Sequence, residues 1–143
     1  MINIEVKNSL MKKYIGIPYK ENGRDFNGVD CYGVIYLFFK EEFGVIVPEV
    51  TDLIYSKDRF SVKEKEDHLL KAIGIKWVPV DTIKKFDVLV FNKKSDCKIS
   101  SHVGLYLGRD KFLHVTEDLS SSIARLDEPY WSSKLYGAMR WHK

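Results

Sequence analysis

The segment 31–42 constrains the fold more than any other part of this chain. It follows Asp30, a residue type favoured as a helix N-cap, and it precedes Gly44, which suits a left-handed C-terminal cap. Its apolar positions cover so much of the helical surface that no broad face is left for water: Val34, Ile35, Leu37 and Phe38. The sequence therefore predicts a central, buried helix.

The second half of the chain has the pattern of short strands. Strands are expected at 87–91, 102–107, 111–115 and 135–141, with Gly108-Arg109-Asp110 as the turn of a hairpin. Two further helices are expected, at 7–15 and from the capping box Ser61-Val62-Lys63-Glu64 to about residue 73, whereas 19–29 has loop composition. Helices followed by an antiparallel meander indicate an α+β domain.

Length and composition limit the classes of protein to consider. A chain of 143 residues with 45% apolar residues can bury a core of its own, so one domain spanning 1–143 is expected. The longest apolar run has six residues (34–39), far short of the ~20 that span a bilayer. The net charge of +3 comes from interleaved acids and bases without a recognition motif, which argues against a nucleic-acid partner.

Only two cysteines are present, too few for a disulfide framework or a four-cysteine metal site. Cys31 follows the Asp30 cap, at a helix N-terminus, where free backbone N–H groups lower the pKa of a thiol and can stabilise an oxyanion. The competing interpretation is an ordinary buried cysteine. Cys97 and His68 lie in polar segments and are interpreted as incidental.

The expected hairpin carries two histidines, His102 and His114. With a three-residue loop, Leu107 pairs with Lys111 and His114 faces Gly104, so both imidazoles share one face with space over the glycine between them. A two-residue loop places His114 on the opposite face unless a bulge restores the register. Each histidine alone is better explained as an ordinary half-buried strand residue, and it is the matched pair that points to a shared site.

Together these residues suggest an activated nucleophile. Cys31 would attack, His102 would take and return the proton, and His114 would orient His102. Metal binding by the same residues is the alternative, but their spacing matches no standard zinc motif, so neither metal nor cofactor is expected.

At this point the chain resembles the NlpC-type cell-wall cysteine peptidases, papain-like enzymes that cut peptidoglycan stem peptides. The resemblance extends from about residue 10 to the C-terminus. The motifs that carry it are Pro18-Tyr19-Lys20, Asp30-Cys31-Tyr32-Gly33-Val34, Phe86-Asp87-Val88-Leu89-Val90-Phe91, His102-Val103-Gly104-Leu105-Tyr106-Leu107-Gly108 and Phe112-Leu113-His114.

The resemblance implies a papain-like fold with N-terminal helices, the nucleophile at the start of the central helix and an antiparallel sheet packed against it. It implies Cys31 as nucleophile, His102 as general base and His114 as third polar residue. Tyr19 would lie beside the nucleophile and bind substrate or oxyanion, and Asp30 would help hold the free amino end of the substrate.

Two positions depart from the family pattern. Tyr32 stands where the family usually has a serine that lines the site, and its side chain is expected to line the site with Tyr19 and Asp30 and to contact the substrate or the oxyanion. Lys85-Phe86 replaces the usual Pro-Gly.

Within the family, the segments 28–34 and 39–44 most resemble the phage and prophage tail-associated branch. The N-terminus has no pattern of a secretion signal, so wall access is expected through a virion or lysis, with phage tail proteins as partners. The expected activity is hydrolysis of stem peptides at a D-γ-glutamyl–diamino acid bond, through a thioester on Cys31. Alternatives are a non-catalytic tail or wall-binding component and an amidase or acyltransferase on the same scaffold. Whether 49–80 forms a lid stays open.

Overall fold

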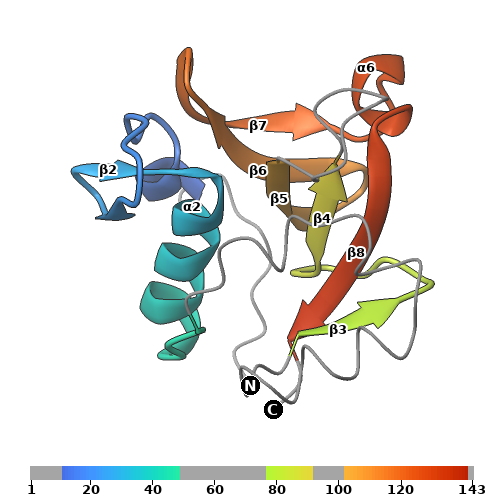
Figure 1. Cartoon of the computed structure of the whole chain (residues 1–143), viewed down its shortest axis with the longest axis horizontal. Coiled ribbons are helices and arrows are strands. Elements are labelled where there is room, and N and C mark those ends of the chain that lie inside the picture. The colour runs from blue at the N-terminus through green and yellow to red at the C-terminus, as the bar shows by residue number, and fades with distance from the viewer. Residues whose placement is uncertain (1–10, 49–76, 92–101, 142–143) are drawn as a thin grey trace.

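The computed structural model describes residues 11–48, 77–91 and 102–141 (Figure 1). Its elements are η1 (Lys12–Tyr14), β1 (Arg24–Asp25), β2 (Gly28–Val29), α2 (Cys31–Phe38), η2 (Phe39–Phe43), β3 (Trp77–Val80), β4 (Val88–Phe91), β5 (His102–Gly108), β6 (Lys111–Thr116), β7 (Leu119–Arg125), α6 (Pro129–Ser132) and β8 (Leu135–Trp141).

Six strands form one sheet in the order β3-β8-β4-β5-β6-β7, with every neighbouring pair antiparallel. Strands β4 to β7 are a meander, and the last strand, β8, lies between β3 and β4. The helix α2 stands on one side of this sheet and packs against β5 and β6 (Figure 1). The architecture is α+β, as the sequence pattern predicted.

The central helix begins where the sequence placed it. Asp30 is extended and accepts a hydrogen bond from the Gly33 N–H, so it is the N-cap of α2. After Phe38 the helix widens into one turn of π-helix, η2, and ends at Gly44, whose φ of 64° gives the left-handed cap. Four residues of α2 singled out for burial are fully or almost fully buried: Val34, Ile35, Leu37 and Phe38.

The two faces of the sheet bury different clusters. Alternate residues of β5 and β6, such as Leu105 and Leu113, join the residues of α2 in the larger core. On the opposite face, Phe91 and Phe112 form a smaller aromatic cluster that Trp131 of α6 covers. The short helix α6 therefore closes the face that α2 does not reach.

Several elements were not predicted. Strand β3 contains Pro79, which is tolerated because this edge strand pairs only with β8. Strand β7 contains a run of serines in place of alternating apolar residues. The loop predicted at 19–29 holds the two-residue strands β1 and β2, which pair antiparallel.

The four predicted strands are confirmed within one or two residues as β4, β5, β6 and β8. Of the helix predicted at 7–15, the described part contains η1. The helix predicted after Ser61, together with Cys97 and His68, lies outside the described residues, as does most of 49–80.

Phe86 occupies the position where the resembled family has glycine, and its φ of 73° is left-handed. Such a conformation costs a bulky residue about 1–3 kcal/mol. Its ring packs against the rings of Phe38 and Phe43, with centroids 5.5 and 5.3 Å away, and these contacts offset the strain.

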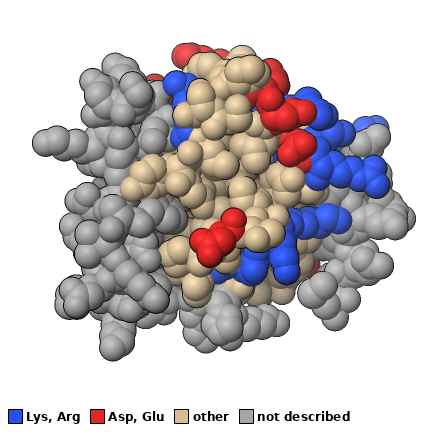
Figure 2. Space-filling model, turned by 90° about the vertical axis from the view of Figure 1, so that its right-hand side faces the viewer, with Lys and Arg blue, Asp and Glu red and all other residues tan. Residues whose placement is uncertain are grey.

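Charged side chains on the β8 side of the molecule are mixed in sign: Figure 2 shows acidic groups beside basic ones around an uncharged strip. Arg140 of β8 donates two hydrogen bonds of 2.8 Å to Asp87, which is 1% exposed. This buried carboxylate is thereby paired and fastens the start of β4 to β8. Within the described ranges, none of the helices has the length and apolar character needed to cross a bilayer.

Candidate active site

The hairpin β5–β6 brings the two histidines together. Leu105 pairs with Leu113 and Tyr106 with Phe112, which is the register predicted for the body of the hairpin. The predicted three-residue loop is wrong, however. Gly108 pairs with Lys111, and a bulge between Tyr106 and Gly108 restores the register.

The turn itself explains this difference. Arg109 and Asp110 have φ values of 52° and 61°, so both central residues of a two-residue turn are left-handed, as the twist of a tight hairpin requires. The bulge then compensates for the shorter loop. His102 and His114 consequently lie on one face, with Nε2 of His102 2.9 Å from Nδ1 of His114.

His114 is enclosed by aromatic rings and is 6% exposed. Phe112 and Trp131 lie against it, with ring centroids 5.0 and 4.9 Å away. Burial lowers the pKa of His114 to about 4, so this imidazole is neutral at pH 7. Sequence reasoning missed Trp131, because a tryptophan in a short helical turn after a proline belongs to no periodic pattern.

Gly104 does not leave an open space between the imidazoles. A Cβ at this position would lie 2.7 Å from the ring of Phe112. The missing side chain therefore makes room for Phe112, whose ring covers the strand between the two histidines and packs against His114.

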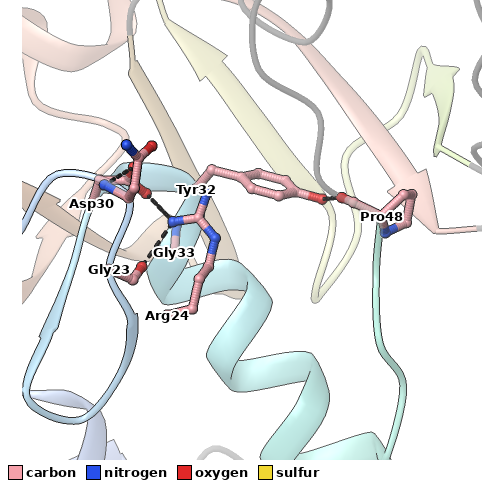
Figure 3. Close-up of polar contacts among 7 residues, drawn as sticks. Gly23, Arg24, Asp30, Tyr32, Gly33 and Pro48 are labelled. Atoms are coloured by element: carbon pink, nitrogen blue, oxygen red, sulfur yellow. Dashed lines mark hydrogen bonds and ion pairs between the residues drawn. The ribbon is translucent and has the colours of Figure 1, made fainter.

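The start of α2 is a network built around Asp30 (Figure 3). Oδ1 accepts hydrogen bonds of 2.7 Å from the Gly33 N–H and from Nη1 of Arg24, and Oδ2 accepts one of 3.0 Å from the Asn22 N–H. Arg24 also donates to the carbonyl of Gly23. The N-cap carboxylate is thus paired with a cation as well as with the helix.

Tyr19 lies beside this network. It bridges to Val29, immediately before the cap, and Lys20 N–H donates to the Val29 carbonyl. Burial raises the pKa of Tyr19, and the charges of Glu117, Asp30 and Cys31 raise it further. The structure therefore brings Tyr19, Asp30 and Cys31 together, with Cys31 half-buried at the first position of α2.

Tyr32 has a different place from the one expected. Its side chain is fully buried, its hydroxyl donates to the Pro48 carbonyl at 2.5 Å, and Nε1 of Trp77 donates to that hydroxyl at 3.3 Å. One helical position turns the side chain by about 100°, and Figure 3 shows the ring pointing from the helix start toward Pro48. The expectation that the Tyr32 side chain lines the site is corrected: it anchors the helix start in the core.

The strands that carry the histidine pair are also the strands against which α2 packs, while the two imidazoles lie on the face that Trp131 covers. His102 begins β5 and His114 lies near the end of β6, and both strands pack against α2. Glu117, in the turn after β6, is close enough to act on Tyr19.

The N-terminal segment is fastened by Ser121 of β7. Its Oγ accepts from the Ile17 N–H at 2.8 Å and donates to the Tyr14 carbonyl, and its backbone pairs with Gly16 and Ile17. These four bonds tie the segment before Tyr19 to the edge of the sheet.

An activated-thiol constellation is the chemistry that this arrangement suits: a cysteine at a helix N-terminus, two hydrogen-bonded imidazoles and a nearby phenol. In the described ranges, no three His, Cys, Asp or Glu side chains are grouped so that they could hold a metal ion.

Comparison with known proteins gives the family of this chain and several relatives. The model of the NlpC/P60 family matches residues 16–140. The chain is 27% identical over 141 residues to the murein DD-endopeptidase MepS/murein LD-carboxypeptidase of Escherichia coli K12. The aligned region covers 96% of this chain and 64% of that protein. The chain is also 30% identical over 130 residues to the gamma-DL-glutamyl hydrolase of Bacillus subtilis 168, covering 90% of this chain and 27% of that protein.

Among solved structures, an NlpC/P60 family protein from Bacillus cereus ATCC 10987 superposes with a TM-score of 0.66 at 23% identity, over 93% of this chain and 38% of that one. This likeness confirms the papain-like α+β fold that the sequence resemblance implied. The chain thus spans 64% or less of the lengths of these relatives.

Proposed function

Because the chain belongs to the NlpC/P60 family, which includes murein endopeptidases and peptidoglycan hydrolases, we propose that it hydrolyses an amide bond in peptidoglycan stem peptides through a thioester on Cys31. One observation carries this proposal: the hydrogen-bonded pair His102–His114 lies on the two strands that pack against the helix opened by Cys31.

In the first step the Cys31 thiolate attacks the carbonyl carbon of the scissile amide. The N–H groups at the start of α2 and the hydroxyl of Tyr19 stabilise the resulting oxyanion. His102 then gives its proton to the departing amine, the C–N bond breaks, and an acyl-thioester on Cys31 remains. Water attacks this thioester with His102 as base, which releases the acid and restores the thiol.

In this mechanism the two histidines have different roles because their surroundings differ. Nε2 of His102 faces His114, so Nδ1 is the atom that exchanges the proton with Sγ of Cys31. Burial keeps His114 neutral, and its Nδ1 can then accept a hydrogen bond from protonated His102. Positive charge formed during catalysis therefore resides on His102, next to the thiolate.

We place the scissile bond between a D-γ-glutamyl residue and a diamino acid. The gamma-DL-glutamyl hydrolase among the relatives supports a γ-glutamyl substrate. Asp30 is the group that would receive a free amino end, but its oxygens already bind Arg24 and two backbone N–H groups. An ammonium group would have to share this carboxylate with the guanidinium.

The route to the cell wall follows from the resemblance of segments 28–34 and 39–44 to the phage and prophage tail-associated branch. On this proposal the domain, 1–143, reaches peptidoglycan in a virion or on lysis, with tail proteins as partners.

Mass spectrometry of purified peptidoglycan, digested by the wild type beside Cys31→Ala, tests this function. We expect new fragments ending at D-γ-glutamate with the wild type and none with the variant, while circular dichroism shows both folded. Identical fragments from both proteins would refute a Cys31 mechanism. Fragments joined to a second amine would indicate acyl transfer, and a wild type without products would indicate a binding component.

A further inference from the structure

Trp131 touches both histidines of the pair. Its ring stacks on His102 with centroids 5.5 Å apart and planes 28° apart, and it meets the edge of His114 at 4.9 Å and 82°. The two imidazoles are 5.1 Å apart, so the three rings form a closed triangle.

Trp131 comes from outside the sheet, unlike the other rings around the pair. It belongs to α6, whose first residue is Pro129. The backbone N–H of Trp131 donates a hydrogen bond of 3.0 Å to the Glu128 carbonyl. Its ring is seated on Phe91 and Phe112, at 5.1 and 5.4 Å. The indole therefore has one defined position over the histidines.

The contacts of the indole have two physical consequences. A flat ring stacked on His102 limits rotation of that imidazole, and an aromatic face close to it favours its cationic form. A large apolar ring against His114 also excludes water, which would otherwise compete for the hydrogen bond between the two rings. Both effects act on the pair without any contact with substrate.

We propose that Trp131 is a positioning residue for the reaction: it holds the His102–His114 hydrogen bond in one tautomeric arrangement and shields it from water. The inference rests on the proposed function, in which that bond orients the general base. Loss of the ring then slows the chemical step, because the imidazole no longer faces the thiolate in one geometry. Substrate binding is unaffected.

Two substitutions at this position separate the effect of an aromatic ring from the effect of apolar volume alone. Trp131→Phe keeps an aromatic ring, whereas Trp131→Leu keeps apolar bulk without one. Leu126→Ala serves as the matched control, because Leu126 is buried in the same cluster and truncating it costs packing only.

With a synthetic muropeptide, we expect Trp131→Leu to lower kcat by about 10-fold to 100-fold with KM within about twofold, the size of effect that misplacement of a catalytic group by about 1 Å produces. Trp131→Phe retains kcat within about threefold, and Leu126→Ala lowers the free energy of unfolding without this loss of kcat. Equal kcat for the Leu and Phe variants, or an equal loss in Leu126→Ala, overturns the proposal.

Nitrogen-15 chemical shifts of the two imidazoles give a readout that needs no substrate. The wild type and Trp131→Phe should each show one fixed tautomer per ring, and Trp131→Leu should show averaged shifts. Unaltered shifts in Trp131→Leu contradict the positioning role. If Cys31→Ala leaves cleavage unchanged, the proposed function fails while these shifts still decide whether Trp131 orders the pair.

Discussion

Two imidazoles joined by one hydrogen bond have different surroundings, and the proposed mechanism uses that difference. His114 is enclosed by Phe112 and Trp131, whereas His102 is half-buried at the start of β5. Strand periodicity predicts that the two histidines share a face if the hairpin loop has three residues, and the structure reaches that face through a two-residue turn and a bulge. Periodicity could not predict Trp131, which follows β7 in sequence and reaches the pair only through tertiary packing.

The buried neutral state of His114 makes stability depend on pH. Its pKa is about 4 in the folded protein and about 6.5 when unfolded, so the unfolded chain takes up a proton first as the pH falls. The stabilisation is complete above about pH 6.5 and is lost toward pH 4, on the order of 3 kcal/mol in all.

Urea unfolding of the wild type and His114→Asn at pH 7, 5.5 and 4.5 measures this contribution. We expect the wild type to lose more free energy of unfolding than the variant over this range. Parallel pH dependences in the two proteins would show that His114 is not held neutral by burial.

The element that determines the site is the first turn of α2, where the hairpin β1–β2 lies against the helix. A Cβ on Gly33 would come within 2.1 Å of the Gly23 carbonyl and 2.9 Å of Nη1 of Arg24. The helix start at Asp30 was predictable from N-cap chemistry. The close contact at Gly33 was not, since it depends on how a loop folds back ten residues away.

Gly33→Ala is therefore expected to displace the hairpin that carries Arg24 and adjoins Tyr19. Overpacking of this kind costs about 1–3 kcal/mol, more than the ~1 kcal/mol that alanine gains over glycine in a helix. We expect a lower free energy of unfolding and a reduced rate of stem-peptide cleavage.

Gly44→Ala, at the other end of the same helical segment, is the control. No atom lies within 4 Å of a Cβ there, and the substitution carries only left-handed strain of about 1 kcal/mol. Cleavage by Gly44→Ala should match the wild type. Equal cleavage by both variants and wild type would contradict the role assigned to the hairpin contact.

At the scale of the whole molecule, the proposed mechanism requires two parts of the chain to be held together: the N-terminal segment through α2, and the sheet that carries the histidines. The family resemblance predicted this architecture. It did not predict the fastening by Ser121, because the serine run of β7 does not show which hydroxyl is buried. The single domain spanning 1–143 and the helix after Ser61 stay predictions.

Ser121→Ala tests that fastening. Ser121 is 1% exposed, and its loss leaves the Ile17 N–H and the Tyr14 carbonyl without the bonds that its Oγ makes. An unsatisfied buried group costs about 1–3 kcal/mol, so we expect a lower melting temperature and slower cleavage. Ser120→Ala, at an exposed neighbouring position, should change neither. Equal behaviour of the two variants would remove Ser121 from the assembly of the site.

The central claim, that Cys31 is a nucleophile activated by the helix start and by His102, is tested most directly by the pH dependence of its alkylation. Iodoacetamide is applied between pH 5 and 9 to the wild type and to His102→Ala, and peptide mapping separates Cys31 from Cys97. We predict that Cys31 of the wild type reacts well below about pH 8, where an ordinary thiol is protonated, and that His102→Ala requires a higher pH. The claim would be contradicted if Cys31 of the wild type reacts only at the pH of an ordinary thiol. It would also be contradicted if Cys31 reacts equally well below about pH 8 in the wild type and in His102→Ala.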